Sequence, residues 1–269
     1  MLYLSSQIPN DLFGAAYYLA VKYAPLFLFG IRNTLLIALS STVIGIFLGL
    51  GVGILKSIPI LQDDPLWKKI LIKIVKFFSG VYVEVFRGTP MMVQAVFIYY
   101  AFLDTWKLFP LLGSYKLTAG IVIVSINTGA YMAEIIRAGI QSLDKGQNEA
   151  ARSIGMNNFQ TMVYIILPQA IKNAFPAIGN EFVVNIKDTS VLNVIGITEL
   201  FFQANTVAGT TYKVTEAFFV AAIIYLILTY TTTSILKIIE RKMEMPVSGG
   251  PSSTSTPILV THYHKGSKV

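Results

Sequence analysis

Three long apolar segments constrain this chain more than any other feature of its sequence. They span residues 34–55, 117–140 and 218–239, and each has few charged side chains. A helix crosses the hydrocarbon core of a bilayer in about 20 apolar residues. Charged residues make up 13% of the chain, whereas an ordinary soluble domain has about 25%. The sequence therefore predicts an all-α transmembrane protein.

A fourth apolar segment, residues 82–105, is interrupted by Gly88 and Pro90. Pro90 has no backbone N–H, and a proline at such a position kinks or ends a helix. Residues 91–105 alone are too short to cross the bilayer. We therefore expect the residues before the break to contribute to this span.

The basic residues set the expected orientation, because Lys and Arg are in excess in cytoplasmic loops. If the N-terminus is outside, the lysines at 56–76 lie inside, Lys107 and Lys116 lie outside, and Lys145 and Arg152 lie inside again. The C-terminal tail begins with basic residues and is then also predicted to lie inside. An N-terminus outside and a C-terminus inside require an odd number of spans.

A fifth span is therefore expected between the third and the last apolar segments. Residues 167–186 are the candidate, although Lys172, Asn173, Asn180 and Glu181 make this segment only weakly apolar. A helix with so many polar groups is expected to face protein or a water-filled path rather than lipid. The predicted fold is thus a transmembrane core of about five helices, N-out and C-in.

The predicted membrane domain covers residues 31–242. Before it, residues 1–30 form an apolar segment in which residues 11–30 are either an interfacial helix or an additional span. Residues 66–79 alternate lysines with apolar residues, as in an amphipathic helix at the inner membrane surface. Residues 243–269 contain much Ser, Thr, Gly and Pro, which indicates a disordered cytoplasmic tail.

The composition excludes several kinds of chemistry. The chain has no cysteine, and its two histidines, His262 and His264, lie in the tail. A Cys or His metal site and a His-dependent catalytic site are thereby excluded from the membrane part. The sequence has no G-x-x-x-x-G-K-[ST] loop for nucleotide phosphates. The net charge of +7 comes largely from basic residues that flank the spans, so we expect no nucleic-acid binding, metal, cofactor or catalytic residue.

The most specific motif lies in the segment 141–168. Its fixed positions are, in order, Glu149, Ala150, Ala151, Gly155, Ile165, Leu167 and Pro168. We expect a short helix that begins between residues 145 and 148 and ends at Gly155, because glycine tolerates the left-handed conformation of a helix C-terminus. Pro168 is expected to start the next helix. The two alanines would let a partner surface approach closely, although an ordinary cytoplasmic helix-turn-helix would show some of the same features.

This spacing resembles the EAA loop of bacterial ABC importer permeases at every fixed position. Residues 85–90 (VFRGTP) and 130–140 (AYMAEIIRAGI) resemble segments of the polar amino acid permeases within that superfamily. The resemblance covers roughly residues 25–242. The N-terminal 25 residues, the loop at 57–70 and the tail fall outside it.

The resemblance implies the permease subunit of an importer in the bacterial inner membrane. It implies a separate ABC ATPase subunit that binds the ATP and contacts the seven motif residues. It further implies a second permease subunit, of the same or a paralogous chain, and an extracytoplasmic solute-binding protein. The expected substrate is a polar amino acid.

Two carboxylates are the first candidates for substrate contact. Glu181 and Asp188 lie in or beside the weak fifth span, and ionisable groups at such depth are costly and are often functional. They would contact the α-amino group or a cationic side chain of the substrate. Lys187 could instead neutralise one of them.

Three other residues are further candidates. Gln94 and Asn127 are polar residues within good spans, where they could contact substrate or hydrogen-bond a neighbouring helix. Met91 could supply an adaptable apolar wall or simply face lipid.

Two Glu–Arg pairs share the same spacing. Glu84 and Arg87 are three residues apart, as are Glu134 and Arg137, and this spacing lets two side chains meet on one helix face. Mutual neutralisation is the simpler role. A gate on the cytoplasmic side, or a brace for the coupling loop, is the functional alternative.

Gly45, Gly49 and Gly53 recur every four residues in the first span and predict close packing of a second helix. Two other functions stay open. An ion-gradient-driven transporter would explain the charges within the spans but not the EAA spacing. A membrane-embedded enzyme would depend on Glu181 and Asp188 alone.

Overall fold

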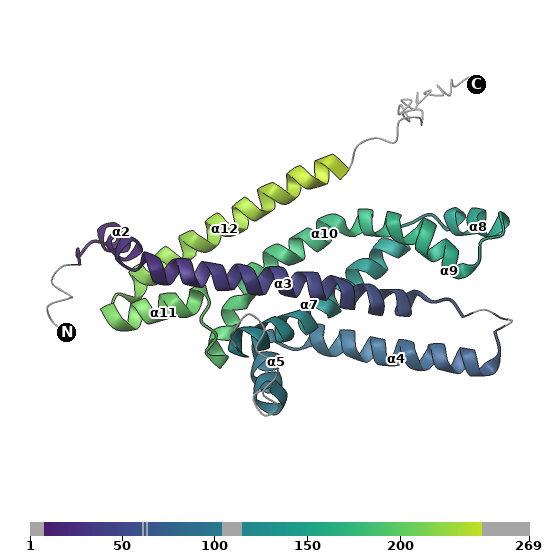
Figure 1. The fold of residues 1–269 in the computed structure, drawn as a ribbon, viewed down its shortest axis with the longest axis horizontal. Coiled ribbons are helices and arrows are strands. Elements are labelled where there is room, and N and C mark those ends of the chain that lie inside the picture. The colour runs from purple at the N-terminus through teal and green to yellow at the C-terminus, as the bar shows by residue number, and fades with distance from the viewer. Residues whose placement is uncertain (1–7, 61, 63, 104–114, 244–269) are drawn as a thin grey trace, which may run out of the picture.

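The computed structural model describes residues 8–60, 62, 64–103 and 115–243, and these residues form helices without any strand (Figure 1). The helical elements are α2 (Leu12–Lys22), α3 (Ala24–Ser57), α4 (Leu66–Gly88), α5 (Met91–Ile98), η1 (Tyr99–Leu103), α7 (Tyr115–Gln141), α8 (Lys145–Ser153), α9 (Asn158–Gln160), η3 (Thr161–Ile166), α10 (Leu167–Asp188), η4 (Thr189–Ile195), α11 (Leu200–Thr211) and α12 (Val214–Met243). The prediction of an all-α fold is confirmed. The predicted tail lies almost wholly outside the described residues.

Five long helices form the body of the molecule: α3, α4, α7, α10 and α12. In Figure 1, α3 and α4 run along the long axis of the molecule, α12 runs diagonally, and α5 is turned across the others. The helices α8 and α9 lie at the same end of the molecule as the start of α4, whereas α2 and α11 lie at the other end. The lysine-rich segments thus gather at the end that contains α8. Which end faces the cytoplasm stays a prediction.

Three described helices are long and apolar enough to cross a membrane: Ala24–Ser57, Tyr115–Gln141 and Val214–Lys242. They contain the three long apolar segments, so those three predictions are confirmed. The predicted fifth span is helical, as α10. It is long and apolar enough to cross a membrane only as part of a bent pair, in which the helical stretch Asn158–Ile195 meets α11 at 54°. Its polar residues explain why hydropathy does not identify α10 by itself.

The N-terminal segment differs from the prediction. Residues 11–30 are not one unit, because α2 ends at Lys22 and α3 begins at Ala24 with Pro25 in its first turn. With 11 residues, α2 is too short to cross a bilayer. The alternative of an additional span was therefore wrong, and the expected boundary at residue 30 falls inside α3.

The second long helix also differs from the prediction. Residues 66–79 are not a separate amphipathic helix, because α4 continues without a break to Gly88. The predicted span 82–105 is divided at Thr89-Pro90, where both residues are extended. Thr89-Pro90 is the first break after Leu66, so the lysines near the start of α4 do not interrupt the helix. The position of the break was predicted correctly, and the helix before it begins at Leu66 rather than at Tyr82.

Close contact between α3 and α7 forms the centre of the fold. A Cβ atom at Gly45 would lie 2.7 Å from Thr128 Cγ2, and one at Gly53 would lie 3.0 Å from the carbonyl oxygen of Ala133. Larger side chains at the glycines would separate the helices. The prediction that these glycines serve packing is confirmed.

A buried polar cluster adds α10 to this centre. Asn185 donates to Thr42 Oγ1 at 2.9 Å and accepts a hydrogen bond from Thr128 Oγ1 at 3.1 Å. Thr42 in turn donates to the carbonyl oxygen of Ala38. The three side chains come from α10, α3 and α7, so the weakly apolar helix is fixed to both of its neighbours.

Candidate functional site

The predicted coupling helix is α8, and its two ends have the geometry that its sequence requires. Asp144 caps the start, accepting a hydrogen bond from the Gly146 N–H at 2.7 Å. Gly155 follows the helix with φ of 87°, in the left-handed region. The N–H groups of Gly155 and Met156 donate to the carbonyl oxygens of Arg152 and Ala151, at 3.0 and 3.2 Å. These two hydrogen bonds are the pattern of a Schellman motif. The predicted start and end of the helix are confirmed.

The motif residues on α8 differ in their exposure to solvent. Ala151 is buried, whereas Glu149 and Ala150 are exposed. Sequence reasoning missed two large apolar side chains later in the same loop. Ile154, directly after α8, is 79% exposed, and Phe159 of α9 is 73% exposed. An apolar residue on either side of Gly155, within an otherwise polar loop, was the available signal. Exposed apolar side chains in such a loop are typical of a docking surface.

The helix after the loop begins earlier than predicted. Asn157 and Gln160 cap it reciprocally, each side chain accepting from the other residue's N–H at 2.9 Å. The backbone is π-helical in η3 and becomes α-helical at Leu167. Pro168 thus lies in the first turn of the α-helical part, as predicted, but the helical backbone already begins at Asn158. Ile165 and Leu167 are half-buried at this transition.

The helix that follows the predicted coupling loop is fixed to the end of α7. Asn173 of α10 donates to Ser142 Oγ at 3.2 Å, and Ser142 donates to the carbonyl oxygen of Gly139 at 2.8 Å. A Cβ atom at Gly139 would lie 2.7 Å from the carbonyl oxygen of Ala170. The first turns of α10 are therefore packed directly against the last turns of α7.

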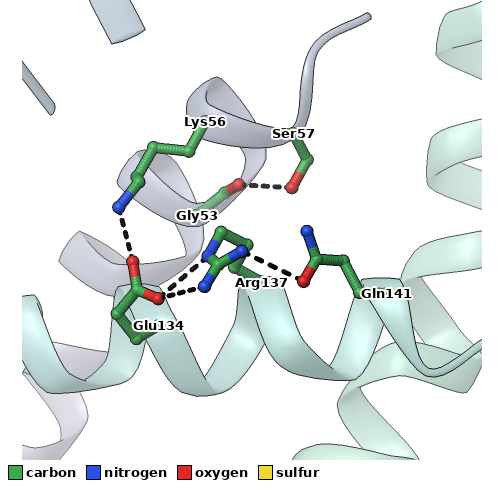
Figure 2. Close-up of polar contacts among 6 residues, drawn as sticks. All are labelled: Gly53, Lys56, Ser57, Glu134, Arg137 and Gln141. Atoms are coloured by element: carbon green, nitrogen blue, oxygen red, sulfur yellow. Dashed lines mark hydrogen bonds and ion pairs between the residues drawn. The ribbon is translucent and has the colours of Figure 1, made fainter. Parts of the chain in front are cut away.

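A charged network joins α3 to α7 near the same end (Figure 2). Glu134 accepts from Lys56 Nζ through one oxygen, and from Arg137 Nε and Nη2, at 2.9 and 2.6 Å, through the other. Arg137 also donates to Gln141 Oε1 at 3.0 Å. The predicted pairing of Glu134 with Arg137 is confirmed. Lys56 was missed because it lies on another helix.

Glu84 and Arg87 behave differently. No ion pair joins them in the described part of the chain, and both side chains are exposed. The guanidinium group of Arg87 lies instead over the ring of Tyr131, 5.3 Å from its centroid. The expectation that these two residues neutralise each other was wrong, because an aromatic ring of α7 lies within reach of the arginine.

The two candidate carboxylates lie on α10. Asp188 is the last residue of this helix and Glu181 lies about two turns before it. Both are half-buried, and neither makes an ion pair within the described ranges. Glu181 lies within electrostatic range of Asp188 and Arg87, and Asp188 within range of Lys187. Charges of both signs, from α10 and α4, thus occur together in this region.

Gln94 and Asn127 hold the break between α4 and α5. Gln94 donates to the carbonyl oxygens of Phe86 and Thr89, both at 2.9 Å, and accepts from Asn127 Nδ2 at 2.8 Å. Asn127 also donates to Phe86 at 3.1 Å. These amides satisfy backbone groups that the break would otherwise leave unpaired. Substrate contact by the two residues stays a prediction.

Met91 follows the break and packs against an apolar core cluster that includes Ile37 and Leu192. Its side chain is half-buried. A wall for substrate also stays a prediction for this residue.

Sequence reasoning missed Glu199, whose side chain is fully buried. Glu199 caps α11 and accepts from the N–H groups of Phe201 and Phe202 at 3.0 and 2.8 Å. Tyr225 of α12 donates to the same carboxylate at 2.9 Å. No local pattern marked Glu199, because glutamate is not among the residues preferred at a helix N-cap.

Comparisons with known proteins agree with this architecture. The sequence profile described as the inner membrane component of binding-protein-dependent transport systems matches residues 70–245. A Rickettsia typhi protein, assigned to a glutamine transport system as its permease GlnP, is 37% identical over 226 residues, which cover 83% of this chain and 96% of that protein. The glutamine transport system permease GlnP of Escherichia coli K12 is 38% identical over 168 residues, which cover 61% of this chain and 74% of the relative.

Two solved structures share the fold. The crystal structure of an amino acid ABC transporter with histidines matches with a TM-score of 0.72 and 39% identity, over 87% of this chain and 100% of that chain. The MetNI methionine ABC transporter, in inward-facing conformations, matches with a TM-score of 0.67 at 20% identity, over 81% of this chain and 96% of that chain. The second likeness concerns the fold alone.

These matches confirm the predicted permease family and the predicted location in the bacterial inner membrane. The family profile covers more than half of the chain, and the Rickettsia relative is matched along nearly its whole length. The chain therefore belongs to the inner membrane components of binding-protein-dependent transport systems, the permease subunits of ABC transporters.

Proposed function

We propose that this chain is the permease subunit of an ATP-driven importer that takes a polar amino acid from an external binding protein. A separate ATPase subunit binds and hydrolyses the ATP, and a second permease subunit, identical or paralogous, completes the pore. The observation that carries the proposal is the exposed, glycine-terminated helix α8 in a chain of this family.

The substrate class is supported by the relatives. Two of them are named as glutamine permeases, and the related crystal structure is that of an amino acid transporter with histidines. Glutamine and histidine share the α-amino and α-carboxylate groups and have polar side chains. A glutamine-like amino acid is therefore the first substrate to test.

The coupling function is supported by the shape of α8. Glu149, Ala150 and Ile154 are all exposed on or directly after α8, so this element offers charged, small and apolar contacts to a partner. The buried Ala151 keeps the helix seated on the chain. We propose that the ATPase contacts this surface and that the whole motif, Glu149 to Pro168, is the coupling loop.

A continuous helical path supports transmission into the membrane. The backbone from Asn158 to Asp188 stays helical through α9, η3 and α10. A displacement of α8 would pass through the short link of residues 154–157, reach α10 along this path, and reach α7 through the Asn173–Ser142 hydrogen bond. ATP would then bias inward- and outward-facing states differently, which is the thermodynamic requirement for driven transport.

The charged groups on α10 and α4 support a zwitterionic substrate. We propose that Glu181 and Asp188 contact the amino group and that Arg87 is available for the carboxylate. Gln94 and Asn127 would act mainly by holding the break in place. The network of Lys56, Glu134 and Arg137 would brace the coupling end.

Copurification is the first test of this proposal. The tagged chain is expressed in its native membrane, solubilised gently, and analysed for the subunits that accompany it. One ABC ATPase per permease chain, together with glutamine uptake that requires ATP and the binding protein, is the expected result. Uptake that survives ATP depletion and follows an ion gradient would instead support a secondary transporter.

Gly155→Ala tests the coupling helix. Alanine at φ of 87° is strained by about 1 kcal/mol, so we expect a weaker association with the ATPase while membrane insertion is unchanged. The control is Gly209→Ala, since Gly209 lies inside α11 and a Cβ atom added there would meet no other atom within 4 Å. An equal loss of ATPase in both variants would refute the role of the turn.

Asp188→Asn tests the substrate site. We expect a rise in the KM for uptake while the ATPase still copurifies, because the substrate amino group would lose a charged partner. Glu216→Gln is the control, since Glu216 pairs with Lys213 at the start of α12, outside the proposed site. Unchanged uptake kinetics in Asp188→Asn would remove this residue from the site.

A further inference from the structure

A cavity of about 460 Å³ lies at the coupling end, apart from the proposed substrate site. It is bounded by the ends of α3 and α7, the first half of α4, and the coupling-loop elements α8 and η3. Its polar lining includes Lys56, Lys76, Gln141, Asp144, Lys145 and Asn148. Cavities of this volume are in the range of small-molecule sites.

The charges around this cavity are not balanced. Lys56 is paired with Glu134, and Asp144, whose carboxylate accepts from the Gly146 N–H, still adds one negative charge to a lining that contains three lysines. Lys76 and Lys145 make no hydrogen bond or ion pair within the described chain. Two ammonium groups from different elements therefore face one cavity that has amide donors beside them. Phosphate oxygens are the acceptors that such a group of donors fits.

The helix α4 connects this cavity to an apolar surface. Successive residues on a helix turn by about 100°, so Lys69, Lys73 and Lys76 share one side. The side that contains Ile72 is buried, and the opposite side exposes Ile70, Ile74 and Phe77, which are 49%, 47% and 66% exposed. The lysine side lies between these two. A molecule with a phosphate head and apolar tails could occupy both sides at once.

We propose that this cavity binds the phosphate headgroup of an anionic phospholipid, whose acyl chains lie along the exposed apolar side of α4. With the predicted orientation, the lipid comes from the inner leaflet. The headgroup joins Lys76 of α4 to Lys145 of the coupling helix. Lipid composition would thereby control how firmly α8 is held before any ATPase contact. A free phosphate compound offers the same head chemistry without tails.

The test measures binding and needs no transport. The complex, with its accompanying subunits, is placed in nanodiscs of phosphatidylcholine with or without phosphatidylglycerol, and the bound phosphatidylglycerol is counted by native mass spectrometry. The variant is Lys76→Gln with Lys145→Gln. The control is Lys172→Gln with Lys237→Gln, which removes the same charge from exposed residues that belong neither to the cavity lining nor to the lysine side of α4.

We expect the wild type and the control to bind phosphatidylglycerol equally, and the cavity variant to bind it on the order of tenfold more weakly. Equal weakening in both variants would indicate diffuse surface attraction and overturn the proposal. The same follows if phosphatidylglycerol binds only after the ATPase has been removed, because an acidic part of that subunit would then be the occupant.

A second arm separates the two sources of phosphate. Inorganic phosphate is added to the complex in phosphatidylcholine alone, and the midpoint of thermal unfolding is recorded. We expect that inorganic phosphate leaves this midpoint unchanged and that phosphatidylglycerol raises it. The lipid proposal would be overturned if inorganic phosphate raised the unfolding midpoint only when Lys76 and Lys145 are present, and phosphatidylglycerol had no effect. The cavity would then be a site for a soluble anion.

Discussion

Two helices of this permease contain a glutamate and an arginine at the same spacing, with different outcomes. In α7, Glu134 pairs with Arg137 and also accepts from Lys56 of α3. In α4, Arg87 forms no ion pair with Glu84 within the described chain, and its guanidinium group lies over the ring of Tyr131. The spacing makes a pair possible, but the neighbouring helix decides whether it forms. A partner from another helix strengthens the first pair, whereas an aromatic ring competes with the second.

The largest effect is expected at Glu134. Glu134→Ala would leave Lys56 and Arg137 without their acceptor in a partly buried site, which costs about 2 kcal/mol. The midpoint of thermal unfolding in detergent should fall by about 4–8 °C. Glu216→Ala serves as the control, because its pair with Lys213 is longer, at 3.4 Å. An equal fall in both variants would show that Glu134 has no special role.

The second prediction measures the link between α3 and α7. A double-mutant cycle of Lys56→Gln and Glu134→Gln should give a coupling energy of about 1 kcal/mol, because both side chains are largely shielded, at 18% and 16% exposure. The coupling should decrease as salt is added, since ions screen charges that remain in contact with water. A coupling energy near zero would mean that Arg137 alone satisfies Glu134.

The third prediction concerns the aromatic contact. Arg87→Gln should destabilise the protein by about 0.5–1 kcal/mol. It should cost little in a Tyr131→Leu background, where the aromatic face is already absent. Thermal unfolding of the four proteins of this cycle is the measurement. The same loss in both backgrounds would assign the effect of Arg87 to something other than the ring.

The smallest effect is expected at Glu84. Glu84→Gln should change stability by less than about 0.5 kcal/mol, because the side chain is exposed and has no ion pair within the described residues. Its unfolding midpoint should coincide with that of the wild type. A clear loss would mean that Glu84 has a partner in the assembled transporter.

Local patterns predicted the features that depend on neighbours in the sequence. The glycine spacing in α3, the left-handed turn at Gly155, the break at Pro90 and the pair Glu134–Arg137 each follow from a few consecutive turns. The structure confirms all four.

Features that depend on contacts between distant segments were not predictable in the same way. Lys56 and Glu134 are 78 positions apart, and no local pattern pairs them. Asn127 of α7 looked available for substrate, yet it donates to Phe86 and Gln94 at the break between α4 and α5, which are 41 and 33 positions away. Glu199 is charged and fully buried, which composition alone would argue against.

The length of α3 has a consequence for the surrounding bilayer. Its 34 residues extend about 51 Å, whereas a bilayer with its headgroups measures about 40–45 Å. To keep both ends within the headgroup regions, α3 must tilt from the membrane normal. A thinner bilayer would increase this tilt and a thicker one would reduce it. Because the glycines of α3 hold it against α7, membrane thickness would be transmitted to the centre of the pore subunit.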